Sequence, residues 1–397
     1  MTDHVQPLVP VLDTGGRAAD HFWAYLEDRS VRFLPYQLAP IFFSTLRELV
    51  AGRSDPAARR AGLAVLARMY RRFGLQLYHD TCIAAAMVDT VRRFPDDRWG
   101  QAPAGAWERG CRRALRLADR AAGVVGEGPQ VTVGEVEARE SPSDGVAVLT
   151  VRPMQRLRYL PGQALPVGTP RRPGQWRWLS PANAPRPDGR VDFHVRAVTG
   201  GRVSPLLVQQ VTAGEMLWLG PACDVGLSLA AAGDADLLLV AGGTGLAPLR
   251  ALVEQVAVAP GGRRVTLVVG ARTVLDLYDA VAVDRLANTH ADWLTVVLAF
   301  ADDPDVEPAV QGDVLSLALY HHRRGQAIYV CGPPQLIRAA RQRLPLTGIP
   351  AGDLHLATTF DRALGTAVWA SRQRDLASGR PASPTDDTPP ADGSSGS

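Results

Sequence analysis

The stretch LLLVAGGTGLAPLRALV, residues 237–253, joins an apolar run to a glycine-rich turn and then to a helical pattern. An unbroken apolar run of this kind is typical of a strand buried on both faces of a parallel sheet. Glycines let a backbone approach a diphosphate closely, and the first N–H groups of a helix attract its negative charge. We therefore predict a dinucleotide-binding turn that contains Gly242, Gly243, Thr244 and Gly245. Glycines that serve close packing alone are the alternative.

Two similar units follow the first one. RVTLVVGAR at 264–272 and AIYVCGPP at 327–334 are apolar runs, and a helical stretch comes after each. Strands that alternate with helices predict a doubly wound α/β domain, which we place at 231–368. Arg272 would follow the second strand, where it could contact a ribose or a 2′-phosphate. The alternative is that Arg272 is a plain surface residue. Cys331 would lie where a nicotinamide binds, unless it is only a small core residue.

The residues before this domain change their pattern twice. Short alternating runs with frequent turns, such as VTVGEVEARE and VDFHVRAVTG, predict an antiparallel β-barrel at 126–230. Apolar residues spaced by three and four, as in AARRAGLAVLARMYRRFG, predict an all-α domain at 19–125. We expect a flexible N-terminus at 1–18. The Pro, Ser, Gly and Asp content of residues 369–397 predicts a disordered tail.

Composition argues against several classes of protein. All 43 basic residues are arginine and the formal net charge is only +3, so no basic surface for nucleic acid is indicated. No apolar run is long enough for a membrane span and no signal pattern opens the chain, which predicts a cytoplasmic protein. Cys82, Cys111, Cys223 and Cys331 have no paired spacing, so neither a disulfide framework nor a zinc site is expected.

Six short motifs, in order along residues 131–361, resemble the ferredoxin–NADP reductase superfamily: YLPGQ, RWLS, GGRVSPLL, GGTGLAP, CGPP and HLATTF. The resemblance implies an FAD-binding barrel followed by a domain that binds NADH or NADPH. It places Arg177 on an FAD phosphate, and it puts Ser180, Cys331 and Phe360 at the reacting centre. Ser180 would lie near the flavin N5, and Phe360 would cover the isoalloxazine. The other cofactor contacts that it implies are Trp178, Leu179, Gly201, Val203, Ser204, the 242–245 turn, Arg272, Gly332 and Pro333.

The flavin pocket departs from that family at two positions. Ala164 and Leu179 stand where the family has tyrosines. An aromatic contact contributes about 0.5–1.5 kcal/mol beyond its burial, so FAD should bind more weakly than usual. Strand alternation points Trp176 and Trp178 away from the face that carries Arg177 and Leu179. Neither tryptophan is therefore expected to replace a missing ring.

The helical third resembles bacterial flavohemoglobins through ARMYRRFGLQLYHD and TCIAAAMVDTVRRF, residues 67–94. Those proteins fuse a globin to such a reductase and, as a family, convert nitric oxide to nitrate with haem, FAD and NAD(P)H. Tyr70 stands at the position of the proximal haem histidine, and Asp80 replaces a tyrosine. A tyrosinate ligand needs help to ionise, so haem binding is doubtful and we assign no metal ligand. The expected result is a globin-like helical domain without an iron site.

The first hypothesis is therefore a flavohemoglobin-like oxidoreductase. It would move electrons from NAD(P)H to FAD and on to oxygen, a small oxidant or a protein acceptor. Two alternatives stay open. One is a nitric oxide dioxygenase with atypical haem ligation, and the other is a non-catalytic protein that binds a nucleotide or a partner.

Overall fold

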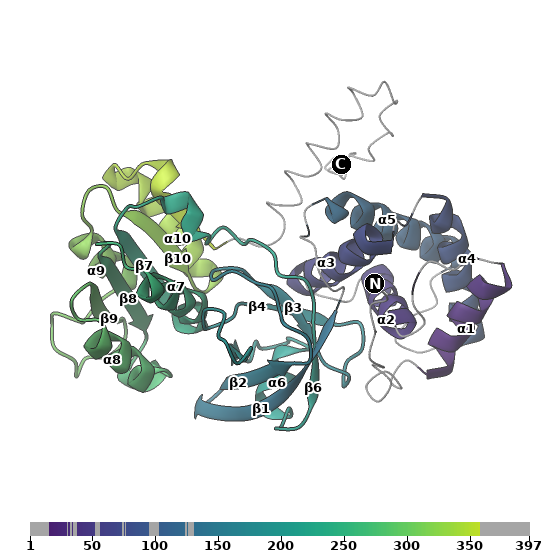
Figure 1. Ribbon diagram of the computed structural model, residues 1–397, viewed down its shortest axis with the longest axis horizontal. Helices are drawn as coiled ribbons and strands as arrows, with labels where there is room; N and C mark the ends of the chain where they lie inside the picture. The colour runs from purple at the N-terminus through teal and green to yellow at the C-terminus, as the bar shows by residue number, and fades with distance from the viewer. Residues whose placement is uncertain are drawn as a thin grey trace, which may run out of the picture.

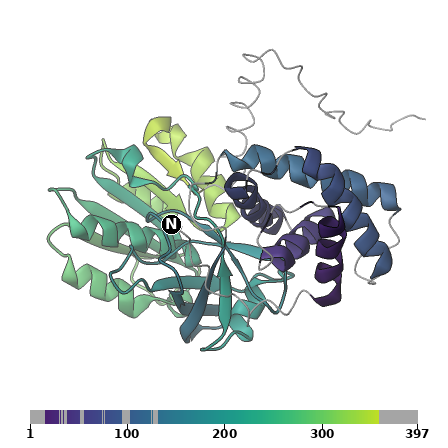
Figure 2. The ribbon, with the colours of Figure 1, turned by 45° about the vertical axis from the view of Figure 1, so that its right-hand side comes forward.

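The computed structural model of the protein describes residues 16–29, 31, 34, 38–51, 56–73, 75, 77–94, 103–123, 125 and 131–357. Figure 1 shows three successive parts of the chain, with helices at one end, an antiparallel sheet in the middle and a parallel sheet at the other end. In the turned view of Figure 2 the N-terminal helices again lie to one side and the parallel-sheet part to the other. Among the described residues no helix is both long and apolar enough to cross a membrane.

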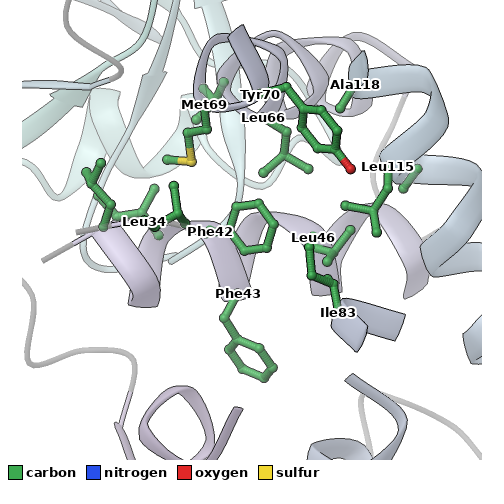
Figure 3. Close-up of a cluster of buried hydrophobic side chains, with 14 of the residues drawn as sticks. Leu34, Phe42, Phe43, Leu46, Leu66, Met69, Tyr70, Ile83, Leu115 and Ala118 are labelled. Atoms are coloured by element: carbon green, nitrogen blue, oxygen red, sulfur yellow. The ribbon is translucent and has the colours of Figure 1, made fainter. Parts of the chain in front are cut away.

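The first part is helical because its apolar side chains recur at intervals of three and four and bury one stripe of each helix. Phe22, Phe43 and Leu46 are buried in its core, and the rings of Phe22 and Phe43 lie 5.1 Å apart. Figure 3 shows this core, with the ring of Tyr70 beside Leu66. The helices are α1 (Gly16–Asp28), α2 (Ala39–Ala51), α3 (Pro56–Phe73), α4 (Leu77–Arg93) and α5 (Ala104–Ala122).

The second part is an antiparallel sheet of six strands in the order β4-β3-β6-β1-β2-β5. Alternate residues build its interior, since Val191, Phe193 and Val195 are buried in one apolar cluster. A bridge between Pro181 and Phe193 joins the two edges of the sheet, which closes it as the alternation predicted. The elements are β1 (Thr132–Ser143), β2 (Val146–Pro153), β3 (Leu165–Gly168), β4 (Trp176–Leu179), β5 (Val191–Arg196), α6 (Ser204–Gln209) and β6 (Met216–Leu219).

The helices and the outer face of this sheet share one core. Trp176 is 1% exposed, its indole N–H donates to Thr45 Oγ1 at 3.1 Å, and its ring lies 6.0 Å from that of Trp218. A Cβ at Gly174 would lie 2.2 Å from the carbonyl oxygen of Ser44, so only glycine allows this approach. The helices therefore cover a large apolar face of the barrel and are not a separately packed unit.

The third part is a parallel sheet in the order β11-β10-β7-β8-β9. Leu239 packs on one face with α7 and α8, and Val240 packs on the other with α9 and α10. This confirms the predicted doubly wound arrangement, and we keep 19–125, 126–230 and 231–368 as proposed domain limits. The elements are β7 (Leu237–Gly242), α7 (Leu246–Val258), β8 (Val265–Ala271), α8 (Ala280–Thr289), β9 (Leu294–Phe300), α9 (Val314–His321), β10 (Ala327–Cys331), α10 (Pro334–Arg343) and β11 (Leu354–Leu356).

Candidate functional site

The carboxyl ends of β7 and β10 mark the point where the parallel sheet reverses its direction of winding. After β7 the chain adds β8 and β9 on one side, and it then returns to place β10 on the other side of β7. Loops that leave two such strands diverge, and the crevice between them is where dinucleotides bind in this class of sheet. Residues 242–245 begin at the last residue of β7, and residues 331–334 begin at the last residue of β10. The structure therefore brings these two predicted segments together.

The glycines of these segments have two different physical roles. A Cβ at Gly245 would lie 2.2 Å from the carbonyl oxygen of Cys331, and a Cβ at Gly332 would lie 3.1 Å from the Cα of Gly242. These glycines let the two turns pack backbone against backbone. Gly243 differs, since its φ is +52° and its missing Cβ would face the guanidinium of Arg196 at 3.5 Å. Gly245 and Gly332 are therefore explained by close packing of the two turns. Gly243 has no such packing constraint and fits the predicted contact with a ligand.

Arg196 is a candidate site residue that our sequence analysis missed. It ends β5 of the antiparallel sheet and is exposed, and it reaches the glycine turn of the parallel sheet. Across the residues that the structure describes, its guanidinium forms no hydrogen bond or ion pair. An unpaired cation beside a glycine turn is suited to an anionic phosphate. The signal in the sequence was the alternation in VDFHVR, which puts His194 and Arg196 on the face opposite Phe193.

His194 joins the two sheets beside this crevice. Its Nδ1 is hydrogen-bonded to the hydroxyl of Tyr278 at 2.8 Å, and the two rings meet edge to face with centroids 5.4 Å apart. Burial lowers the pKa of His194 to about 3, so the imidazole is neutral at physiological pH. Its Nε2 is buried and has no hydrogen-bond partner in the described part of the chain.

Polar contacts also fix the barrel to α7. Glu254 of α7 accepts a hydrogen bond from the backbone N–H of Ala184 at 2.9 Å, and it lies 3.5 Å from the Arg186 guanidinium. Arg186 also pairs with Asp192 of β5 at 2.8 Å. These partly buried ion pairs are screened less than surface pairs. They hold β5 and the segment after β4 against α7 of the parallel-sheet part of the chain.

The RWLS segment presents its four side chains in different surroundings. Arg177 is half-buried and, within the described ranges, has no hydrogen bond or ion pair. Leu179 is 9% exposed and packs with the barrel core. Trp178 lies at the edge of both the helical core and the parallel-sheet core, on the face opposite Leu179 as the alternation predicted. Ser180 directly follows β4 and is half-buried.

The 200–204 turn is held by hydrogen bonds to the backbone of Val198. The N–H of Val198 donates to the Ser204 hydroxyl at 3.1 Å, and the N–H of Gly201 donates to the Val198 carbonyl at 2.8 Å. Val203 is 4% exposed and belongs to the barrel core, so its side chain is unsuited to lining a ligand site. Gly201 and Ser204 lie in the turn as expected, although the Ser204 hydroxyl already has a protein partner.

The remaining crevice residues are spread along the carboxyl edge of the parallel sheet. Arg272 follows β8, is 74% exposed, and pairs with Asp276 at 3.2 Å. Thr244 is half-buried in the glycine turn, while Pro333 is exposed at the start of α10. Burial raises the pKa of Cys331 to about 12, so this side chain is a thiol and no thiolate nucleophile. Phe360 lies outside the described residues, as do residues 1–15 and 369–397 of the expected flexible ends.

Tyr70 is a core residue that is hydrogen-bonded to another protein side chain. It is 3% exposed, and its hydroxyl donates to a carboxylate oxygen of Asp80 at 2.5 Å. Burial and this hydrogen bond raise the pKa of the phenol far above its usual range. Figure 3 shows its ring enclosed by Leu66, Leu115 and Ala118. Such a phenol stays protonated, which opposes tyrosinate ligation of a haem iron.

Two protein-family models match the two sheets. The oxidoreductase FAD-binding domain matches residues 134–224, and the oxidoreductase NAD-binding domain matches residues 239–342. The chain carries the FAD-binding and NAD-binding domains of an oxidoreductase. The expected cofactors FAD and NAD(P)H are thereby confirmed, and so is the assignment to FAD-dependent NAD(P)H oxidoreductases at the level of the two domains.

Sequence relatives and solved structures resemble this pair of domains. The chain is 32% identical over 225 residues to the ferredoxin–NAD(P)(+) reductase component of the naphthalene 1,2-dioxygenase system of Pseudomonas putida. This match covers 54% of this chain and 65% of that protein. The structure of a ferredoxin reductase in carbazole 1,9a-dioxygenase superposes with a TM-score of 0.52 at 25% identity, covering 58% of this chain and 69% of that one. The chain spans about half to two thirds of the length of the curated relatives it matches.

The resemblance to flavohemoglobins is wrong as a family assignment. Both matched models lie after residue 133, and the relatives named above are reductases of dioxygenase systems. A flavohemoglobin from Malassezia yamatoensis superposes over 88% of this chain and 96% of its own with a TM-score of 0.54, but at 14% identity this likeness concerns the fold alone. The spacing of apolar residues in helices does not specify a haem, because any helical bundle needs the same stripe. The first part is therefore described as helices that cover the FAD-binding domain, and a globin domain is not assigned.

Proposed function

We propose that this protein is a reductase that takes reducing equivalents from a nicotinamide dinucleotide and delivers them, through FAD, to a protein acceptor of the oxygenase-component or ferredoxin kind. The observation that carries the proposal is the contact between Arg196 of the FAD-binding domain and the glycine turn at Gly243 of the NAD-binding domain. This contact supports a single crevice that both cofactors share. The reductase relatives support a protein acceptor over oxygen or another small oxidant.

The side chains present on the barrel fit FAD. Arg177 is a half-buried cation without a protein partner among the described residues, as a phosphate site requires. The buried Nε2 of His194 and the guanidinium of Arg196 are further polar groups left unpaired between the two domains in the described part of the chain. When bound, FAD would accept two electrons as a hydride and release them singly to an acceptor. In this proposal Ser180, Cys331 and the 201–204 turn retain the positions at the cofactors that the family resemblance implies.

The protein scaffold contributes orientation and exclusion of water. Glu254, Arg186 and the His194–Tyr278 pair hold the two domains together, which fixes the distance between their cofactor sites. Hydride transfer is sensitive to such positioning, because reacting atoms must be held at near-contact distance. The neutral Cys331 thiol, desolvated at the end of β10, would supply a small wall with no charge beside the nicotinamide.

The test is anaerobic reduction of the FAD-loaded full chain. NADH or NADPH should bleach the flavin absorbance, and reoxidation should be fast with a ferredoxin and slow with dissolved oxygen. A flavin that binds stoichiometrically and that neither dinucleotide reduces would refute the reductase assignment. Rapid reoxidation by oxygen alone, with no acceleration by the protein acceptor, would refute the protein-acceptor assignment.

A further inference from the structure

We propose that this protein selects NADH over NADPH, and that Asp276 with the acidic turn at 302–305 is what determines the choice. The inference rests on the proposed function, since it concerns the dinucleotide that the NAD-binding domain takes. The family models leave the two dinucleotides undistinguished, and Arg272 taken alone would favour NADPH.

The sheet topology identifies the part of the dinucleotide that this end of β8 meets. β7 lies between β10 and β8, and Gly242 at the end of β7 pairs in register with Gly270 near the end of β8. The diphosphate belongs at the glycine turn after β7. One half of the dinucleotide therefore extends toward β10 and the other toward β8. In such sheets the residues after the second strand contact the adenosine ribose, where NADPH carries its extra phosphate.

The only arginine directly after β8 is already engaged by a carboxylate. The Arg272 guanidinium lies 3.2 Å from Asp276 Oδ1. The other carboxylate oxygen, Oδ2, accepts hydrogen bonds from the Thr273 backbone N–H at 3.2 Å and from the Thr273 hydroxyl at 3.0 Å. These bonds fix the carboxylate at the start of the short helix of residues 274–276, so it is oriented before any ligand arrives.

A second acidic segment is anchored to the same loop. The backbone N–H of Asp302 donates to the carbonyl oxygen of Arg272 at 2.8 Å, and Asp303 accepts from the backbone N–H of Val274 at 3.0 Å. Asp305 is bound to this turn through its N–H, which donates to Asp303 at 3.2 Å. The carboxylates of Asp276 and Asp303 therefore lie at this loop with one arginine. Asp302 and Asp305 add two further negative charges to the same turn.

This arrangement accepts a ribose hydroxyl and opposes a phosphate. A carboxylate can accept the hydrogen bond of a 2′-hydroxyl, which is the interaction that recognises NADH. A 2′-phosphate carries close to two negative charges, and it would have to displace Asp276 from Arg272 beside the carboxylate of Asp303. We therefore expect kcat/KM for NADH to exceed that for NADPH by at least about tenfold, the range that one unfavourable charge contact produces.

The experiment has a kinetic arm and a binding arm on the full chain. The kinetic arm compares kcat/KM for flavin reduction by NADH and by NADPH. The binding arm compares the Kd of adenosine 5′-monophosphate with that of adenosine 2′,5′-bisphosphate, which probes the ribose position without any redox step. Asp276→Asn keeps the acceptor for Thr273 and removes the charge. Asp284→Asn, on α8 with its carboxylate bound to Asn288, is the matched control.

We expect the bisphosphate to bind more weakly than the monophosphate to the unaltered protein. Asp276→Asn should tighten bisphosphate binding several-fold, bring the kinetic ratio toward one and leave thermal stability nearly unchanged, and Asp284→Asn should alter neither ratio. A preference for NADPH, or an unchanged ratio in Asp276→Asn, would overturn the inference. Failure of both dinucleotides to reduce the flavin would refute the proposed function, and the binding arm would still decide the selectivity.

Discussion

The Nδ1 of His194 in the FAD-binding domain lies 2.8 Å from the hydroxyl oxygen of Tyr278 in the NAD-binding domain. The side chain of His194 is fully buried, and its pKa is lowered to about 3 because burial disfavours the charged imidazolium. A neutral imidazole between two domains holds them together without the desolvation cost of a buried charge. This contact is therefore expected to be independent of pH across the physiological range.

Removal of the Tyr278 hydroxyl should weaken this contact. Tyr278→Phe leaves the imidazole nitrogen buried without its partner, which costs about 1–3 kcal/mol. We expect a lower midpoint of urea unfolding and slower flavin reduction by NADH, because the two domains lose a fixed orientation. Tyr320→Phe is the control, since Tyr320 is 85% exposed. Equal effects of the two substitutions would show that the His194–Tyr278 bond has no special role.

Two glycines of the same turn should respond very differently to alanine. Gly245→Ala would place a Cβ 2.2 Å from the Cys331 carbonyl oxygen, so the turns after β7 and β10 must separate. In Gly243→Ala the new Cβ would meet no atom closer than 3.5 Å. The only cost to the unfolding free energy is the strain of a φ of +52°, about 1 kcal/mol. Unfolding titrations of Gly245→Ala should show that the unfolding free energy falls by more than about 2 kcal/mol, as expected for backbone overpacking. NADH titrations of the same variant should show a loss of NADH binding. Similar losses in both variants would contradict the division of roles.

Arg177→Ala should weaken the binding of FAD. A charge-assisted bond to a phosphate contributes about 1.5–3 kcal/mol, so the Kd for FAD should rise roughly tenfold to a hundredfold. Fluorescence titration of the FAD-free protein measures this change. Arg172→Ala is the matched control, because Arg172 lies in the turn before β4 and is exposed. Unchanged retention of FAD in Arg177→Ala would remove this residue from the flavin site.

The buried Asp80 should make stability depend on pH. Burial raises the pKa of this carboxyl, although the hydrogen bond from Tyr70 opposes the shift. The folded state therefore holds the proton more tightly than the unfolded chain. The stabilisation from this group is greatest below the unfolded pKa of about 3.9, and it is lost as the pH rises through the folded pKa.

Asp80→Asn should remove that part of the pH dependence. The amide oxygen still accepts the hydrogen bond from Tyr70, while the cost of a buried carboxylate disappears. We expect the unfolding free energy at neutral pH to rise and its fall between acidic and neutral pH to become shallower than in the unaltered protein. Urea unfolding across that interval, with the exposed Asp144→Asn as control, measures both effects. If Asp80→Asn were less stable at neutral pH, the ionised carboxylate of Asp80, bound by Tyr70, would stabilise the helices, and the prediction would be wrong.

The local pattern of the sequence determined both sheets and the turn that joins β7 to α7. Leu237 to Ala241 must be buried on both faces because no polar side chain interrupts them. The three glycines at 242, 243 and 245 favour a turn there, because glycine tolerates close backbone approach and a positive φ. Alternation along β4 correctly predicted that Trp176 and Trp178 share a face. These features follow from periods of two and from close backbone contacts, and both are properties of the chain alone.

The tertiary structure alone decided what covers each of those faces. Three contacts depend on residues that are far apart in the chain. The helices bury Trp176, Arg196 approaches Gly243, and His194 is hydrogen-bonded to Tyr278. The helical third shows the same limit, since an apolar stripe at intervals of three and four fits a haem pocket and a solid core equally well. There the hydrogen bond between Tyr70 and Asp80 decides, because it leaves the phenol protonated within a packed core. Periodicity specifies which side chains are buried, and only three-dimensional packing specifies their partners.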